Sequence, residues 1–135
     1  MKKILIMLAA TILLSAGPAH ADMGAQALVD GEVTTEPICF NVVNMAPYTV
    51  VGEFATNYYT TPEGVQATHT ANFRLNSHEK TNFCSAGPFF AGRQLDFTIR
   101  TLIPLFYCRT GIGGDIVIHG EQHDGGTKTW ADCLK

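Results

Sequence analysis

The residues with the clearest potential for chemistry are His119, Glu121 and His123, which are separated from one another by single residues. In an extended strand all three would lie on one face, and two imidazoles with a carboxylate can bind Zn²⁺ or another divalent cation. The glycines at 120, 125 and 126 instead indicate a mobile hairpin tip over residues 120–126, which would not fix ligand geometry. A small metal-binding protein or metal-dependent enzyme is therefore the alternative function. For the favoured, non-enzymatic function we expect no cofactor.

Four widely spaced cysteines form the second chemically informative set, and no two of them have the C-x-x-C spacing of a redox or zinc site. An even number of cysteines in an exported chain predicts two disulfides. Loop-closure entropy does not distinguish the three possible connectivities. We favour Cys39–Cys84 with Cys108–Cys133, because each pair could join neighbouring strands. A catalytic thiol at Cys84 would need a free cysteine, and the even count argues against one.

A Gly/Pro loop with two adjacent aromatic residues, 87–93, is the third feature. Neighbouring residues of an extended chain face opposite ways, so Phe89 and Phe90 cannot both enter a core unless the loop folds back. An exposed phenylalanine beside Arg93 has the composition of a binding hot spot. We therefore predict Phe89, Phe90 and Arg93 as binding residues, with burial of both rings as the alternative.

Other candidates for catalysis are weak. His69 shares a strand face with Ala71, Phe73 and Leu75, which predicts a partly buried, hydrogen-bonded histidine. No Gly-x-Ser-x-Gly motif of a serine hydrolase is present. The glycine-rich stretch 110–115 lacks the lysine of a phosphate loop and leads into a strand. The sequence therefore favours a protein that is not an enzyme.

The N-terminus has the order of residues that is typical of a secretory signal peptide. Lys2 and Lys3 precede an apolar run over residues 4–14, and Ala19-His-Ala21 provides a small-x-small cleavage site. The run is about half the roughly 20 residues that a spanning helix needs. We predict a cleavable signal peptide over residues 1–21, no membrane span in the mature chain, and a periplasmic or secreted location.

The charge of the mature chain limits its partners. The whole chain has 9 basic and 12 acidic residues, and the signal contains two of the basic ones and none of the acidic ones. Residues 22–135 therefore have a formal charge of −5, with no two basic residues adjacent. Nucleic acid and anionic lipid both require clustered Lys and Arg, so we expect neither as the partner.

Alternating apolar and polar residues predict the elements that would position these groups. Leu95, Phe97 and Ile99 alternate most clearly, and with Leu102, Leu105 and Phe106 they form the predicted centre of the core. Pro104 cannot occupy a central ladder, so it should bend the chain or begin an edge strand. Strands are expected over residues 38–43, 48–55, 68–75, 80–84, 95–101, 105–108, 115–119 and 127–133.

Such short strands with turn signals between them predict an all-β, disulfide-stabilised, small antiparallel β-sandwich, or a partly open barrel, of about 7–8 strands. Residues 37–135 would form this single domain, and residues 22–36 a flexible N-terminal arm. The favoured function is an exported, non-enzymatic domain that binds a protein or an envelope component. Loops 87–93 and 120–126 would make the contacts.

Overall fold

The computed structural model describes residues 31–135, so the predicted signal peptide and residues 22–30 of the predicted arm lie outside the described part. The described chain consists of strands and connecting segments, with no helix. Its strands are β1 (Ile38–Asn44), β2 (Val50–Ala55), β3 (Tyr59–Thr60), β4 (Gln66–Ala67), β5 (Thr70–Leu75), β6 (Lys80–Ser85), β7 (Gln94–Arg100), β8 (Pro104–Gly111), β9 (Ile116–His123) and β10 (Gly126–Asp132).

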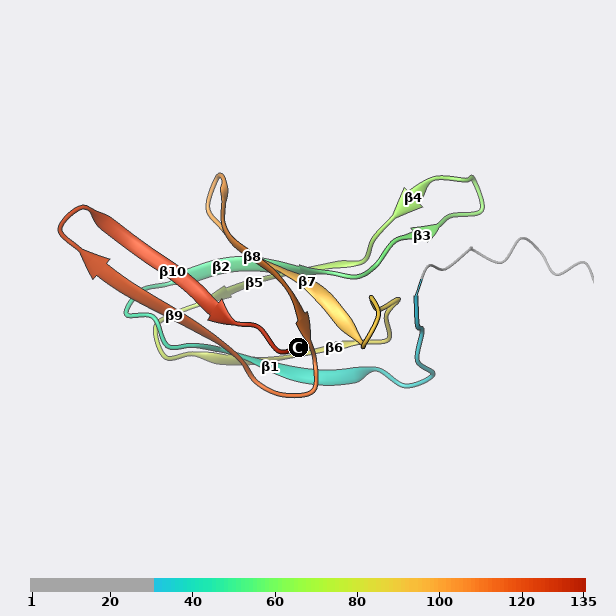
Figure 1. Cartoon of the computed structure of the whole chain (residues 1–135), viewed down its shortest axis with the longest axis horizontal. Coiled ribbons are helices and arrows are strands. Elements are labelled where there is room, and N and C mark those ends of the chain that lie inside the picture. The colour runs from blue at the N-terminus through green and yellow to red at the C-terminus, as the bar shows by residue number, and fades with distance from the viewer. Residues whose placement is uncertain (1–30) are drawn as a thin grey trace, which may run out of the picture.

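Two four-stranded sheets make up the body of the molecule, and Figure 1 shows them one above the other. The first sheet has the order β10-β9-β1-β6 and the second the order β5-β2-β7-β8. Neighbouring strands are antiparallel except β1 and β9, which run parallel. The predicted all-β sandwich is confirmed. The short β3–β4 hairpin, which the sequence did not predict, projects from the end opposite the β9–β10 hairpin (Figure 1).

Alternate residues of the longer strands fill the space between the sheets. Leu95, Phe97 and Ile99 of β7 are buried as predicted, and Phe40 and Val42 of β1 face them from the other sheet. The remaining buried apolar residues are Ala46, Val50, Phe54, Phe73, Leu75, Phe89, Ile112, Ile116, Ile118 and Ala131.

The predicted centre of the core is wrong at Leu102 and Leu105. Leu102 is fully exposed in the β7–β8 turn, and Leu105 is 48% exposed. The even positions of β8 are paired with the inward-facing residues of β7, with Phe106 opposite Ile99, so they face inward and Leu105 faces outward. Phe106 packs against the core as predicted. Pro104 begins β8, an edge strand, in agreement with the sequence.

Both disulfides have the connectivity favoured from the sequence, but they connect different parts of the fold. Cys39 and Cys84 are directly opposite each other on β1 and β6, within one sheet. Cys108 on β8 is bonded to Cys133, just after β10, so this bond joins the two sheets rather than neighbouring strands. Because β8 and β10 are edge strands, one side of the sandwich is covalently closed.

The opposite side is formed by β5 and β6, which are consecutive in the chain but belong to different sheets. A fully buried side chain, Asn44, organises the crossover between them. Its amide nitrogen lies 2.9 to 3.1 Å from the carbonyl oxygens of Tyr48, Leu75 and Asn76, and its oxygen accepts the N–H of Ala46. No disulfide joins β5 to β6, so this side is held by the crossover and by ring contacts such as that of Phe73 with Phe83, whose centroids are 6.2 Å apart.

Candidate functional site

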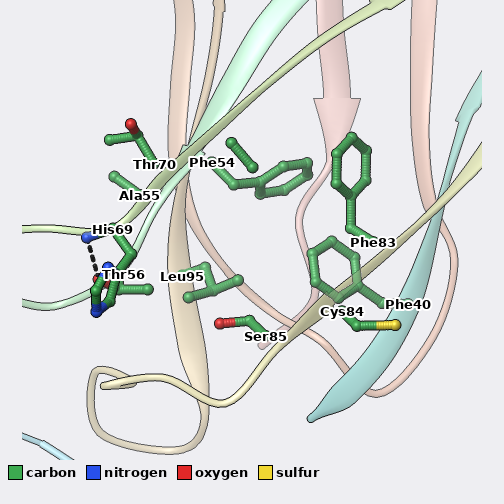
Figure 2. A pocket seen from close by; sticks show the side chains of 11 residues that line it. Phe40, Phe54, Ala55, Thr56, His69, Thr70, Phe83, Cys84, Ser85 and Leu95 are labelled. Atoms are coloured by element: carbon green, nitrogen blue, oxygen red, sulfur yellow. Dashed lines mark hydrogen bonds between the residues drawn. The ribbon is translucent and has the colours of Figure 1, made fainter.

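A cleft of about 170 Å³ lies on this open side of the sandwich, between β5 and β6. Figure 2 shows the rings of Phe40, Phe54 and Phe83 at one end, Leu95 near the middle, and Thr56 with His69 at the other end. Both sheets contribute to its walls. The lining residues are Phe40, Phe54, Ala55, Thr56, His69, Thr70, Ala71, Phe83, Cys84, Ser85 and Leu95.

Three aromatic rings from three strands form the apolar end of the cleft. The ring centroid of Phe54 lies 5.0 Å from that of Phe40 and 5.4 Å from that of Phe83. Phe40 and Phe54 are almost fully buried, whereas Phe83 on the edge strand β6 is only partly buried. Edge-to-face and tilted contacts of this kind are favourable aromatic geometries. The cleft therefore has a preformed apolar wall of closely packed rings.

Two of the hydroxyl groups that line the cleft are already hydrogen-bonded. The Thr56 hydroxyl donates to the carbonyl oxygen of Asn57 and accepts the backbone N–H of His69. The Ser85 hydroxyl oxygen accepts the N–H of Gly87. No hydrogen bond joins Ser85 to His69 within residues 31–135, so the hydroxyl has no base to activate it there.

The charge and size of the cleft restrict what it can accept. His69 is the only titratable side chain among the lining residues. Cys84 is oxidised in its disulfide with Cys39, and no Asp, Glu, Lys or Arg lines the cleft. Its volume of about 170 Å³ is smaller than the roughly 300–1,000 Å³ of typical small-molecule sites. A preformed, uncharged cleft of this size suits an apolar side chain better than a whole substrate.

The edge strands differ in how well they are protected from pairing with another chain. β8 begins at Pro104, contains a register shift and is tied by Cys108. Proline and irregular pairing are devices that block edge-to-edge association. Residues 70–73 of β5 and 81–85 of β6 contain no charge, proline or glycine, and the charged residues of the two strands, Arg74 and Lys80, lie toward the crossover. The stretches beside the cleft are therefore unprotected edges.

His69 is placed differently from the prediction. It is exposed at the mouth of the cleft, just before β5, rather than partly buried. Its ring stacks on that of Tyr59 with centroids 4.6 Å apart, and its backbone pairs with Thr56. The β3–β4 hairpin carries Tyr59 beyond the sheets, and this pulls the imidazole away from the core. The exposed Tyr58 lies next to this pair in the chain.

The three predicted metal ligands lie on the outer face of β9, as the alternation of an extended strand requires. Residues 120–123 belong to β9, so the predicted 120–126 loop is reduced to a tight turn before β10. His119 Nε2 lies 2.7 Å from a carboxylate oxygen of Asp132, and His123 Nε2 lies 3.1 Å from Glu121. These are two separate pairs. Within residues 31–135 no three His, Cys, Asp or Glu side chains are grouped so that they could hold a metal ion.

The predicted binding loop places its two phenylalanines in different environments. Phe89 is fully buried in the core, so its side chain is not available to a partner in this structure. Phe90 is partly exposed and lies under the guanidinium of Arg109, whose central carbon is 3.4 Å from the ring centroid. Arg109 also donates to the carboxylate of Asp96, which accepts the Tyr107 hydroxyl. That hydrogen bond raises the pKa of Tyr107.

Arg93, the third predicted binding residue, is exposed and pairs with Glu32 at 2.7 Å. The same hydrogen bonds lower the pKa of the Glu32 carboxyl and raise that of Arg93. The backbones of Glu32 and Phe89 also exchange hydrogen bonds, and the N–H of Thr34 donates to Ala86. Residues 32–34 of the predicted arm are therefore attached to loop 87–93.

A serine–histidine contact that the sequence analysis did not identify occurs in the 76–79 turn. The Ser77 hydroxyl lies 2.7 Å from Nδ1 of His78. The same hydroxyl donates its proton to the carbonyl oxygen of Ala46, so His78 cannot accept it as a general base in this arrangement. The contact is one that holds the turn.

Comparison with known proteins adds little to this description. No protein-family model matches the sequence, and no curated protein matches it. Among solved structures, one described as "NMR structure of the protein from Eubacterium rectale" aligns with 73% of this chain and 89% of its own, at 16% identity and a TM-score of 0.40. In residues 31–135, no helix has the length and apolar character required to cross a bilayer.

Proposed function

We propose that this chain is an exported, non-enzymatic β-sandwich domain that binds a protein or a protein component of the cell envelope. The observation that carries the proposal is the uncharged aromatic cleft between the unprotected edges β5 and β6. Apolar clefts and free strand edges are costly to leave exposed, and both are surfaces on which other chains dock. The opposite side of the domain is closed by Cys108–Cys133, which leaves the cleft side as the open one.

An enzymatic role is not favoured by the arrangement of the titratable groups. The only histidine in the cleft stacks on Tyr59, and the serine there accepts a backbone N–H. On the outer face of β9, His119 and His123 are engaged by two different carboxylates rather than converging on one point. No observation therefore favours the metal-dependent alternative over the binding function.

The covalent structure supports the proposed location. Two disulfides and no free cysteine within residues 31–135 are the state expected in an oxidising compartment. The proposed export signal at residues 1–21 would deliver the chain there. A partner should therefore be sought in the periplasm, on the cell surface or outside the cell.

Site-specific photocrosslinking tests the proposal. A photoreactive phenylalanine analogue is placed at position 71, which lines the cleft, or at position 102, which is exposed in the β7–β8 turn away from β5. In cells that export the protein, we expect a crosslinked product of defined mass from position 71 and little or none from position 102. The partner is then identified by mass spectrometry and its binding to the purified domain is measured. Equal crosslinking from both positions, or none from position 71, would contradict the proposal.

A further inference from the structure

We infer that the cleft binds an extended peptide segment, which adds to β5 as a further antiparallel or parallel strand and inserts one apolar side chain beside Ala71. The inference rests on the proposed binding function and specifies the class of its ligand. Strand addition uses main-chain hydrogen bonds for affinity and pockets for alternate side chains for specificity. The open side of this sandwich offers both, along its two edge strands β5 and β6.

The inward-facing residues of β5 and β6 differ in size, and this difference favours β5 as the strand to which the peptide adds. Phe83 of β6 already fills the space in front of its strand with an aromatic ring. On β5 the corresponding inward position is Ala71, which is opposite Phe54 on β2 and is exposed although its neighbours on that face, Phe73 and Leu75, are buried. A strand alongside β5 would lie about 4.8 Å away, and its inward side chain could reach the rings of the cleft. The empty volume is therefore next to β5.

The polar groups of β5 also suit a peptide. An edge strand leaves alternate backbone N–H and C=O groups without a ladder partner, and β5 pairs only with β2. None of the lining side chains bears a permanent charge, so the inserted side chain is apolar. At 170 Å³ the cleft accommodates a side chain or two, which again favours a peptide over a larger ligand.

Charge on the outer face of β5 defines the rest of the ligand. Arg74 is exposed there and makes no ion pair within residues 31–135, while Arg100, two strands away on β7, is paired with Glu53. The residues of an added strand that point outward would lie next to Arg74, and opposite charges on neighbouring strands are favourable. The ligand should therefore alternate apolar residues with neutral or acidic ones. This local preference contrasts with the net negative charge of the domain.

Selection from a library of displayed random peptides of roughly ten residues, a common strand length, tests the inference on the exported and processed full chain. We expect the selected peptides to alternate apolar with neutral or acidic residues. Their affinity should fall about 30-fold or more with Ala71→Glu, which puts a charge into the cleft, and change less than about threefold with Leu102→Glu, which puts the same charge in the exposed β7–β8 turn. Both positions are exposed, and unchanged circular dichroism and disulfide mass would confirm that both variants fold.

Methylation of alternate peptide amides separates strand addition from simple apolar binding. Methyl groups on the amides that face β5 should weaken binding about tenfold or more, while those on the other amides should not. Amide hydrogen exchange over residues 70–73 should slow when the peptide binds. If the two methylated sets bind equally but Ala71→Glu still abolishes binding, the cleft is a binding site and strand addition is wrong. If no selected peptide is sensitive to Ala71→Glu, both the inference and the proposed function fail.

Discussion

Cys108 and Cys133 join the two sheets through a disulfide whose Cα atoms are 6.5 Å apart, at the side of the sandwich formed by the edge strands β8 and β10. The backbone N–H of Gly111 donates to the carbonyl oxygen of Leu134 beside it, which extends the closure toward the C-terminus. No disulfide joins the other two edge strands, β5 and β6, which are connected only by the 76–79 turn. This asymmetry leaves β5 and β6 available for another chain.

Removing the disulfides should therefore have different structural consequences at similar energetic cost. The replacement of Cys108 and Cys133 by serine should lower the free energy of unfolding by about 3–4 kcal/mol, because it removes a long loop constraint on the unfolded chain. Replacing Cys39 and Cys84 in the same way should cost a similar amount. Urea unfolding measures both. Only the loss of Cys108–Cys133 should speed amide exchange in β8 and at Leu134. Equal effects of the two replacements on this exchange would show that Cys108–Cys133 does not close this side of the sandwich.

Asn44 should be one of the most sensitive polar positions in the domain. Asn44→Ala leaves a buried N–H and several carbonyl groups without their partner, and we expect a loss of about 3 kcal/mol or more in the free energy of unfolding. Asn41→Ala is the matched control on the same strand, since its side chain binds Asp115 on the exposed face. That change should cost about 0.5–1 kcal/mol. Equal losses in urea unfolding would show that the crossover does not depend on Asn44.

The attachment of residues 32–34 to loop 87–93 should depend on pH. Hydrogen bonds from Arg93 hold the pKa of the Glu32 carboxyl below its ordinary value of 4.5. A lowered folded-state pKa means that the contribution of the pair is complete above that ordinary value and is lost as pH falls through the lowered one. NMR signals of the Glu32 and Phe89 amides should therefore shift together in this acidic range. Glu32→Gln should abolish the transition, and its persistence in that variant would disprove the assignment.

Alanine substitutions at the two phenylalanines of the 87–93 loop should differ in their effects on stability and binding. Phe89→Ala removes a fully buried ring and should lower the free energy of unfolding by about 3–5 kcal/mol. Phe90→Ala removes a surface contact with Arg109 and should cost about 1 kcal/mol. Thermal unfolding of the two variants measures these losses. If Phe90→Ala or Arg93→Ala weakens binding of the crosslinked partner without loss of stability, the predicted loop takes part in the interface.

Much of the fold could be predicted because apolar alternation and punctuation by Pro and Gly are local signals. The strands around Leu95, Phe97 and Ile99 and the edge position of Pro104 follow from them. Leu102 is misassigned because it lies in the β7–β8 turn, and Leu105 because β8 pairs with β7 in a register that turns Phe106 inward and its neighbour outward. Neither the length of a turn nor the register of the next strand is marked reliably in the sequence.

The cleft could not be predicted, because it depends on which edge strands lie on the same side of the two sheets. Ala71 and Phe83 are close only because the chain crosses from one sheet to the other between them. The absence of charge, proline and glycine over residues 70–73 and 81–85 was visible, and it is the one local sign of two unprotected edges. Conversely, His119, Glu121 and His123 share a face as predicted but are divided between two carboxylate pairs, which spacing alone does not reveal.

Isothermal titration of the crosslinked partner into the purified domain and two matched variants tests the central claim most directly. Ala71→Glu introduces a charge into the cleft, and Leu102→Glu introduces the same charge in the exposed β7–β8 turn. We predict that the first variant loses about 30-fold or more in affinity and that the second stays within about threefold of the unchanged domain. Equal affinity for all three proteins would show that the open side of the sandwich is not the binding site.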